Sequence, residues 1–511
     1  MKRRLFCSVL LLTFTVVNLS VSFGDTDPKY KYITGYRPVP SRPHRRAGGE
    51  SFPPLPLPVV PMRRTEKKKP PSPPVLLGKL RYGIANQWIG YGNNATHLIR
   101  FTNRKLGVKY RATRVDIGSS AIVPEKLPIL FMTGLISFSL SDSALERLKN
   151  YLIDGGTLFL DCNSGHYEIK ESFTAMIQKM FPATPLRPLP QDHPLYYTYY
   201  RIEDVTYSLA PSDPRIYNPE WRGSYPQAKR KDGPPLIYGL DIGSRTAIFL
   251  STYDLGCGWA GKSFPFGNRY SVEDSLKIGT NMVAYVLQFY PVGKYLSMEK
   301  SYRLLSSSDS DFSLAQVIHS GYWDPAPTRL GYFLKSMREK STFLPDLKLT
   351  YIPLSSEKIF SSPFLYLTGH DRFSLSDKER ANLRVYFQKG GTLFVENRCG
   401  RSTFDESFRE EMKNVLPDAK LEKLSGEHPL FHCFYSIEDV LYSPWVEGYK
   451  LKKAPPFIEG VKIGNRYPVI YSKYDLAWGW EREVYPPYTR GVIGMDSFKL
   501  AANIMVYSLT H

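Results

Sequence analysis

Cysteine is scarce in this chain, with five residues among 511. One of them lies in the first 24 residues, and no later cysteine has a cysteine counterpart when the two halves of the chain are compared. A small disulfide-stapled fold is therefore excluded, because 42% hydrophobic residues can build ordinary cores in a chain of this length. We expect mostly free thiols among the four later cysteines, and one bridge stays open as an alternative. These cysteines are Cys162, Cys257, Cys399 and Cys433.

Long apolar segments are also missing after residue 24, where no stretch approaches the roughly 18 continuous apolar residues of a membrane-spanning helix. The first 24 residues have a basic start at Lys2–Arg4, an apolar stretch over residues 5–17 and a small-residue site at 22–24. This pattern predicts a signal peptide over 1–24, and it favours cleavage over an uncleaved membrane anchor. We expect an exported protein, periplasmic or secreted, with no transmembrane segment after cleavage.

Acidic residues are too few to balance the basic ones, and the net charge of +19 is unevenly distributed. Residues 25–79 hold twelve Lys/Arg against four Asp/Glu, so the residues from 80 onward carry only about half of the excess. Twelve prolines lie between Pro38 and Pro74, which predicts a disordered, basic, Pro-rich linker over 25–78. A spacer is favoured over a proline-rich ligand for a partner. The modest charge of the remainder and the expected export argue against nucleic-acid binding.

A duplicated sequence fills the rest of the chain. LFMTGLISFSLSD at 130–142 recurs as LYLTGHDRFSLSD at 365–377, and GGTLF, HPL and IEDV recur with the same offset of 235. A period this long indicates two homologous domains rather than a solenoid. We place them at about 80–291 and 305–511, and we expect them to pack against each other.

Each copy alternates strand and helix signals. Short apolar runs such as ILFM and FLYL suit buried parallel strands, and Ser376 with Glu379 forms a capping box that starts a helix. The order strand, helix, strand, helix predicts a mainly parallel sheet covered by helices. Loops that leave the carboxyl ends of such strands share one edge, where ligands bind. His370 and Cys399 follow two of these strands, so we expect them to face one crevice.

The motifs YLTGH, FSLSD, GGTLF, CG followed by FDESFR, and HPLF together resemble the bacterial domain of unknown function 4159 family, once per copy. The resemblance implies two tandem flavodoxin-like domains, similar to class I glutamine amidotransferases, and it implies no established activity. The second copy keeps the family's polar positions. The first replaces His370 by Leu135 and Cys399 by Ser164, so we expect its site to be degenerate and the second copy to hold the working site.

Three chemistries compete for that site. Cys399 could be a nucleophile with His370 or His428 as base, although the G-x-C-x-G pattern of amidotransferases is absent. A metal site at His428 and neighbouring residues is disfavoured because Pro429 interrupts the helical spacing. Arginines near a helix start suit an anionic ligand, unless they pair with the acids of their own helix.

We therefore predict a non-catalytic ligand-binding or assembly module of the cell envelope, with no cofactor and no metal. The ligand is an anionic small molecule or glycan, or the partner is an envelope protein. The alternative is a cysteine-dependent hydrolase or amidotransferase-like enzyme that uses Cys399 with His370 or His428. The predicted ligand-binding residues are Gly369, His370, Asp371, Arg398, Cys399, Asp405, Arg409 and His428.

Overall fold

The computed structural model describes residues 72–210, 228–262, 267–298, 310, 312–448, 451–480 and 485–510. The signal peptide predicted over 1–24 lies outside them, as does the predicted linker as far as Pro71. The last residues of that predicted linker are not linker, because strand β1 begins at Val75. An apolar run directly after Pro74 pairs with two neighbouring strands, and this makes it part of the fold.

Repeat 1 (residues 75–298) is built on a seven-stranded sheet whose spatial order is β2-β1-β3-β4-β9-β8-β5. The first five strands pair in parallel. At one edge, β8 pairs antiparallel with β9, and β5 pairs antiparallel with β8. The strands, in spatial order, are β2 (Arg111–Asp116), β1 (Val75–Arg81), β3 (Ile129–Gly134), β4 (Thr157–Cys162), β9 (Arg245–Ser251), β8 (Ile237–Ile242) and β5 (Arg187–Pro188).

Repeat 2 (residues 312–510) has a sheet of the same order, β12-β11-β13-β14-β19-β18-β15. Numbered along the chain, the parallel strands of each repeat run 2-1-3-4-5 in space, which is the flavodoxin-like order. The predicted fold of two tandem, mainly parallel α/β domains is therefore confirmed. The strands, in spatial order, are β12 (Thr350–Pro353), β11 (Leu314–Ile318), β13 (Phe364–Gly369), β14 (Thr392–Asn397), β19 (Arg466–Ser472), β18 (Ile458–Ile463) and β15 (Leu421–Lys423).

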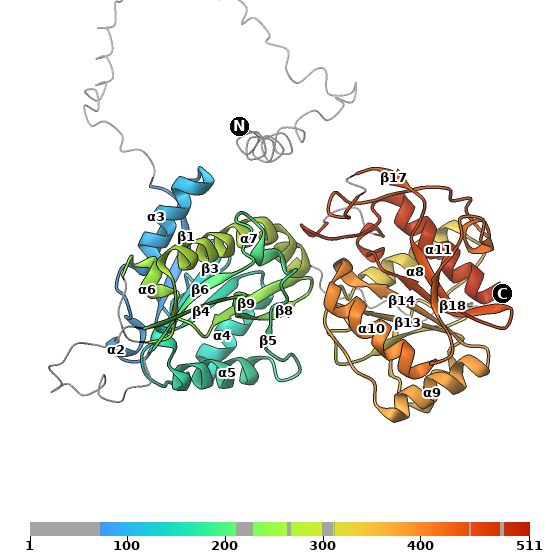
Figure 1. The fold of residues 1–511 in the computed structure, drawn as a ribbon, viewed down its shortest axis with the longest axis horizontal. Coiled ribbons are helices and arrows are strands. Elements are labelled where there is room, and N and C mark those ends of the chain that lie inside the picture. Colours follow the sequence, from blue (N-terminus) through green and yellow to red (C-terminus); the bar gives the residue numbers. More distant parts are fainter. Residues whose placement is uncertain are drawn as a thin grey trace, which may run out of the picture. The chain divides into compact units, whose positions relative to one another are not determined.

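Helices cover both faces of each sheet (Figure 1). In repeat 1, α3 and α7 pack with one set of strand side chains, and α4 and α5 pack with the alternate set. In repeat 2, α8 and α11 lie on one face, and α9 and α10 lie on the other. The bounds are α3 Asn94–Leu106, α4 Asp142–Ile153, α5 Tyr167–Met180, α7 Val272–Met298, α8 Arg329–Lys340, α9 Asp377–Gln388, α10 Ser402–Val415 and α11 Met495–Thr510.

Local sequence explains the ends of these elements. Ser376 accepts a hydrogen bond from the Glu379 amide, and the Glu379 side chain accepts one from the Ser376 amide, so the predicted capping box is confirmed.

Helix α7 continues through Pro291 to Met298, beyond the domain boundary predicted at 291. No described helix combines the length and the apolar composition that a membrane span requires.

Both repeats belong to one compact unit that extends from Pro71 to His511. Tyr488, which belongs to repeat 2, packs in the hydrophobic cluster of repeat 1 against the rings of Tyr197 and Phe289. The Arg490 guanidinium donates to the Asp192 carboxylate at 2.7 Å, and the Ser244 hydroxyl donates to the Pro325 carbonyl at 2.9 Å. Apolar and polar contacts therefore join the two copies.

Candidate functional site

The carboxyl ends of β11 and β13 mark the topological switch point of repeat 2. In the order 2-1-3-4-5 the chain leaves these adjacent strands in opposite lateral directions, and ligands of open α/β sheets bind in the crevice that results. His319 directly follows β11, and His370 directly follows β13. The backbone amides of His370 and Asp371 donate to the Gly321 carbonyl at 3.3 and 3.0 Å, which ties the two loops together.

A pocket of about 380 Å³ opens at this switch point. Its walls come from both repeats, because the segment after α5 and the end of β8 in repeat 1 face the strand ends of repeat 2. This volume lies within the range of small-molecule sites. The ionisable side chains of the walls include Arg187, His193, Asp241, His319, Asp324, His370, Asp371 and Arg401.

His370 is the most distinctive group in the pocket. Its residue surface is 2% exposed, and neither ring nitrogen has a hydrogen-bond partner among the described residues. The nearest carboxylate oxygen belongs to Asp241 of repeat 1, 3.7 Å from Nδ1, which is too long for a hydrogen bond. Burial lowers the His370 pKa to about 4 despite that carboxylate, so the ring is neutral at pH 7.

Two carboxyls of the pocket have contrasting environments. Burial and the charge of Asp241 raise the Asp371 pKa to about 6, although Arg187 forms an ion pair with Asp371 at 3.1 Å. Burial alone would raise the Asp241 pKa, yet the hydrogen bond from Thr246 and the nearby His370 and His193 rings hold it below its usual range. The Thr246 hydroxyl donates to Asp241 at 2.5 Å. Arg187 and Asp371 also join the two repeats across the pocket.

His319 and His193 are oriented by their partners. The His319 Nε2 atom lies 2.9 Å from the Thr368 carbonyl, and its Nδ1 atom accepts from the Gly321 amide at 3.0 Å. The His193 Nδ1 atom accepts from the Leu195 amide at 3.1 Å. Burial lowers the pKa of His319 to about 4 and that of His193 to about 3, so both rings are neutral at pH 7.

Cys399 lies outside the residues that line the pocket. It is 6% exposed, and the Thr489 hydroxyl is 3.5 Å from its Sγ atom. Burial and the nearby Asp475 carboxylate raise the pKa of the thiol to about 12. No hydrogen bond joins Cys399 to a histidine within the described residues, so this site does not present an activated thiolate.

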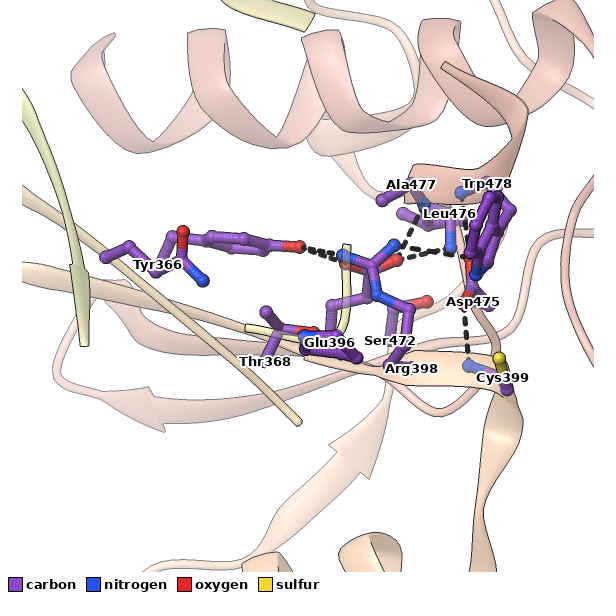
Figure 2. A network of polar contacts seen from close by, with 12 residues as sticks. Tyr366, Thr368, Glu396, Arg398, Cys399, Ser472, Asp475, Leu476, Ala477 and Trp478 are labelled. Carbon is purple, nitrogen blue, oxygen red and sulfur yellow. Dashed lines mark hydrogen bonds and ion pairs between the residues drawn. The ribbon is translucent and has the colours of Figure 1, made fainter. Parts of the chain in front are cut away.

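The loop that holds Cys399 is fixed by a buried polar network (Figure 2). The Glu396 carboxylate accepts hydrogen bonds from the amides of Leu476 and Ala477 at 2.6 and 2.7 Å, and from the Tyr366 hydroxyl. Arg398 lies in the same network, 3.5 Å from the carboxylate of Glu396 and 3.8 Å from that of Asp475. These contacts connect the loop after β14 to the loop after β19, which is a structural role.

Repeat 1 contains the same framework. The Asp161 carboxylate, which corresponds to Glu396, accepts from the amides of Leu255 and Gly256 at 2.8 and 3.0 Å. The cation differs, because Asn163 replaces Arg398. Lys79 of β1 is buried nearby and donates to backbone carbonyls and to the Asn94 side chain. Both repeats therefore keep the acid that binds the loop amides, Asp161 or Glu396, although the predicted site residues differ between them.

The remaining predicted residues have partners elsewhere. Arg409 forms ion pairs with Asp405 at 2.8 Å and with Glu459 at 2.6 Å, and Asp405 also accepts from the Tyr471 hydroxyl at 2.8 Å. His428 caps a short turn, where its Nδ1 atom accepts from the Leu430 amide at 3.2 Å. None of these three predicted residues lines the pocket. Gly369 ends β13 and positions the two residues that do.

Sequence reasoning did not place Arg187, His193, Asp241 and His319 at the site. His319 could have been found, because it follows a strand at the same sheet edge as His370. The other three belong to repeat 1, and they reach the pocket only through contacts between repeats. No group of three or more metal-ligating side chains gathers in the part of the chain that the structure describes.

A protein-family comparison agrees with the duplicated fold. The model for a domain of unknown function (DUF4159) matches residues 76–287 and again residues 313–509, which together exceed half of the chain. The chain belongs to the DUF4159 family. The two DUF4159 matches correspond to the two sheets, so the pocket lies between two copies of one family domain. No curated protein matches the chain.

Proposed function

We propose that this DUF4159 protein is exported and binds a small polar molecule, without transforming it, in the pocket at the switch point of repeat 2. The observation that supports binding most directly is the His370 ring, which is buried in a pocket of suitable size with both nitrogens unsatisfied. An unsatisfied buried polar group is costly, and a ligand that hydrogen-bonds to it removes that cost. The proposal makes the contact between repeats part of the site.

Arg401 gives the pocket a hydrogen-bond donor beside His370. It follows Gly400 at the start of α10, and its backbone is held by two hydrogen bonds to the Asn397 side chain at 2.9 Å. Among the described residues, no carboxylate forms an ion pair within 4.0 Å of its guanidinium. Arg401 therefore replaces Arg409 in this proposal as the arginine whose loss should weaken binding.

The cysteine-dependent hydrolase or amidotransferase-like enzyme remains the weaker proposal. A thiol whose pKa is raised to about 12 is protonated at neutral pH, and it lies outside the pocket. The export part of the proposal rests on the pattern of residues 1–24, which the structure does not describe. Fractionation of expressing cells and the intact mass of the product test it, with Asp25 expected as the first residue of the mature chain.

A thermal-shift series tests binding. Neutral sugars, amino acids, nucleosides and dicarboxylates are added one at a time to the wild-type protein and to the variants His370→Leu, Arg401→Ala and Arg409→Ala. We expect at least one compound to raise the melting temperature of the wild type and of Arg409→Ala, and to leave His370→Leu and Arg401→Ala unshifted. Equal shifts in all four proteins, or no shift in any, would count against the pocket as the binding site.

A further inference from the structure

The pocket is lined by charges of both signs, two guanidiniums and three carboxyls. Arg187 and Asp371 form an ion pair across it at 3.1 Å. Arg401 is the second cation, and the nearby Asp241 carboxylate stabilises its positive charge. Asp324 also lines the pocket, and burial raises its pKa to about 6. An anionic ligand would add to this excess of acids, and a buried charge without a partner is unfavourable.

The histidines add no charge at neutral pH. Burial holds the pKa of His193, His319 and His370 at about 3, 4 and 4. A neutral imidazole offers one donor and one acceptor. His370 therefore needs a partner that donates and accepts at short range, rather than a purely anionic or purely cationic group.

The other polar walls offer complementary groups. Carboxylates only accept hydrogen bonds and a guanidinium only donates them, and the pocket presents Asp371 and Asp324 together with Arg401. A hydroxyl group both donates and accepts, so one ligand with several hydroxyls can satisfy all of these side chains without adding charge. No single charged group can do so.

The pocket also has an aromatic and apolar lining. The half-buried Trp323 ring lines it and packs on the Tyr351 ring with centroids 5.2 Å apart. Pro188, Leu189 and Pro190 line the pocket from repeat 1. Aromatic rings suit ligands that have one apolar face and one polar edge. The combination of this lining with groups that donate and accept hydrogen bonds narrows the chemistry of the ligand.

We propose that the ligand of this pocket is a neutral sugar, of one or two rings, whose hydroxyls bond to His370, Arg401 and the carboxylates while a ring face packs on Trp323. This inference rests on the proposed binding function and refines it. The competing outcome is the anionic ligand predicted from the sequence. That prediction relied on arginines such as Arg409 and Arg372, which in the structure form ion pairs with acids outside the pocket.

The test is isothermal titration calorimetry of the mature two-repeat protein. The probes are glucose, galactose, N-acetylglucosamine and the disaccharides maltose and cellobiose, with glucuronate and glucosamine as anionic and cationic counterparts. We expect at least one neutral sugar to bind, and the charged counterparts to bind at least tenfold more weakly. Trp323→Ala and His370→Leu should each weaken the neutral sugar at least tenfold. Tyr167→Ala, an aromatic side chain 69% exposed and outside the pocket, should not change binding.

The outcomes separate this inference from the binding function. Tighter binding of glucuronate than of glucose, lost in His370→Leu, would overturn the sugar inference and leave the pocket as a binding site. Failure of every sugar, together with a thermal shift by a non-sugar that requires His370, would have the same consequence. Failure of all probes in both experiments would overturn both proposals.

Discussion

Ser164 and Cys399 occupy the same position in the two repeats, and both have the same left-handed backbone, with φ of 57° and 56°. Each amide donates to the aspartate that follows the next parallel strand: Ser164 to Asp254 at 2.7 Å and Cys399 to Asp475 at 2.6 Å. The turn is therefore a property of the fold, and a cysteine is not required to form it. Its conformation alone is no sign of catalysis.

The first prediction concerns the reactivity of Cys399. Because the thiol is buried and its pKa is raised to about 12, iodoacetamide at pH 8 should leave it unmodified in the native protein. Cys433 is only half-buried and is the internal comparison, which should react faster. Peptide mass spectrometry after timed labelling measures both. Rapid native labelling of Cys399, with a midpoint well below 9, would return the enzyme proposal to first place.

The second prediction concerns the Glu396 network. Glu396→Gln should lower the free energy of unfolding by about 3 kcal/mol, because it leaves the buried Arg398 without its closest acid and turns an amide toward backbone donors. Glu406→Gln is the matched control. Glu406 pairs with Arg372 on the surface, so its loss should cost less than about 1 kcal/mol. Urea unfolding of the two variants measures the contrast, and equal costs would refute it.

The third prediction concerns pH. The His370 pKa is about 4 in the folded protein, below the ordinary value of 6.5, so the unfolded chain binds the extra proton first. The free energy of unfolding that depends on the neutral His370 ring is fully present above pH 6.5, and it is lost as the pH falls toward 4. Relative to His370→Leu, the wild type should lose up to about 3 kcal/mol over that range.

Chemical denaturation at pH 7, 6, 5 and 4 measures this difference. Asp371 and Asp324 have raised pKa values, which change stability in the opposite direction over part of the same range. Both proteins retain these carboxyls, so we take the difference between the two curves. If the free energies of unfolding of the wild type and of His370→Leu fall in parallel from pH 7 to pH 4, the prediction of a neutral buried His370 ring is wrong.

The fourth prediction concerns Gly400. Its φ of 65° lies in the left-handed region, and a Cβ atom there would approach the Arg490 Cβ and carbonyl oxygen to 2.6 and 2.8 Å. Gly400→Ala should therefore destabilise the protein by about 2 kcal/mol or more. Gly426→Ala is a control, because a Cβ atom at that glycine meets nothing within 4 Å. Thermal denaturation should lower the melting temperature only for the first variant.

Much of the fold could be predicted from the sequence, because short apolar runs and glycine-terminated helices are local signals. The runs ILFM and FLYL form β3 and β13, and the strand and helix signals alternate as predicted. The repeat offset also identified corresponding residues correctly, since Asp161 and Glu396 bind equivalent backbone amides. The strand order agrees with the flavodoxin-like fold that the family resemblance implied.

The site was predictable only in part. His370 and Asp371 line the pocket because they follow a strand at the switch point, and this rule needs only local sequence. Cys399 obeys the same rule, yet a segment 90 residues later covers its thiol through Thr489. Asp241 faces His370 only because one repeat contacts the other. Contacts between distant segments determine whether Cys399 and Asp241 reach the pocket, and local sequence patterns do not reveal such contacts.

Tyr488 has a consequence for how the duplication can be taken apart. Its ring stands in the hydrophobic cluster of repeat 1, between side chains that the other copy supplies. Separation of the two copies would expose that cluster on repeat 1 and would uncover the Tyr488 ring on repeat 2, however similar the two halves are in sequence. The two copies descend from one domain, but the smallest piece that keeps its surfaces covered is the pair.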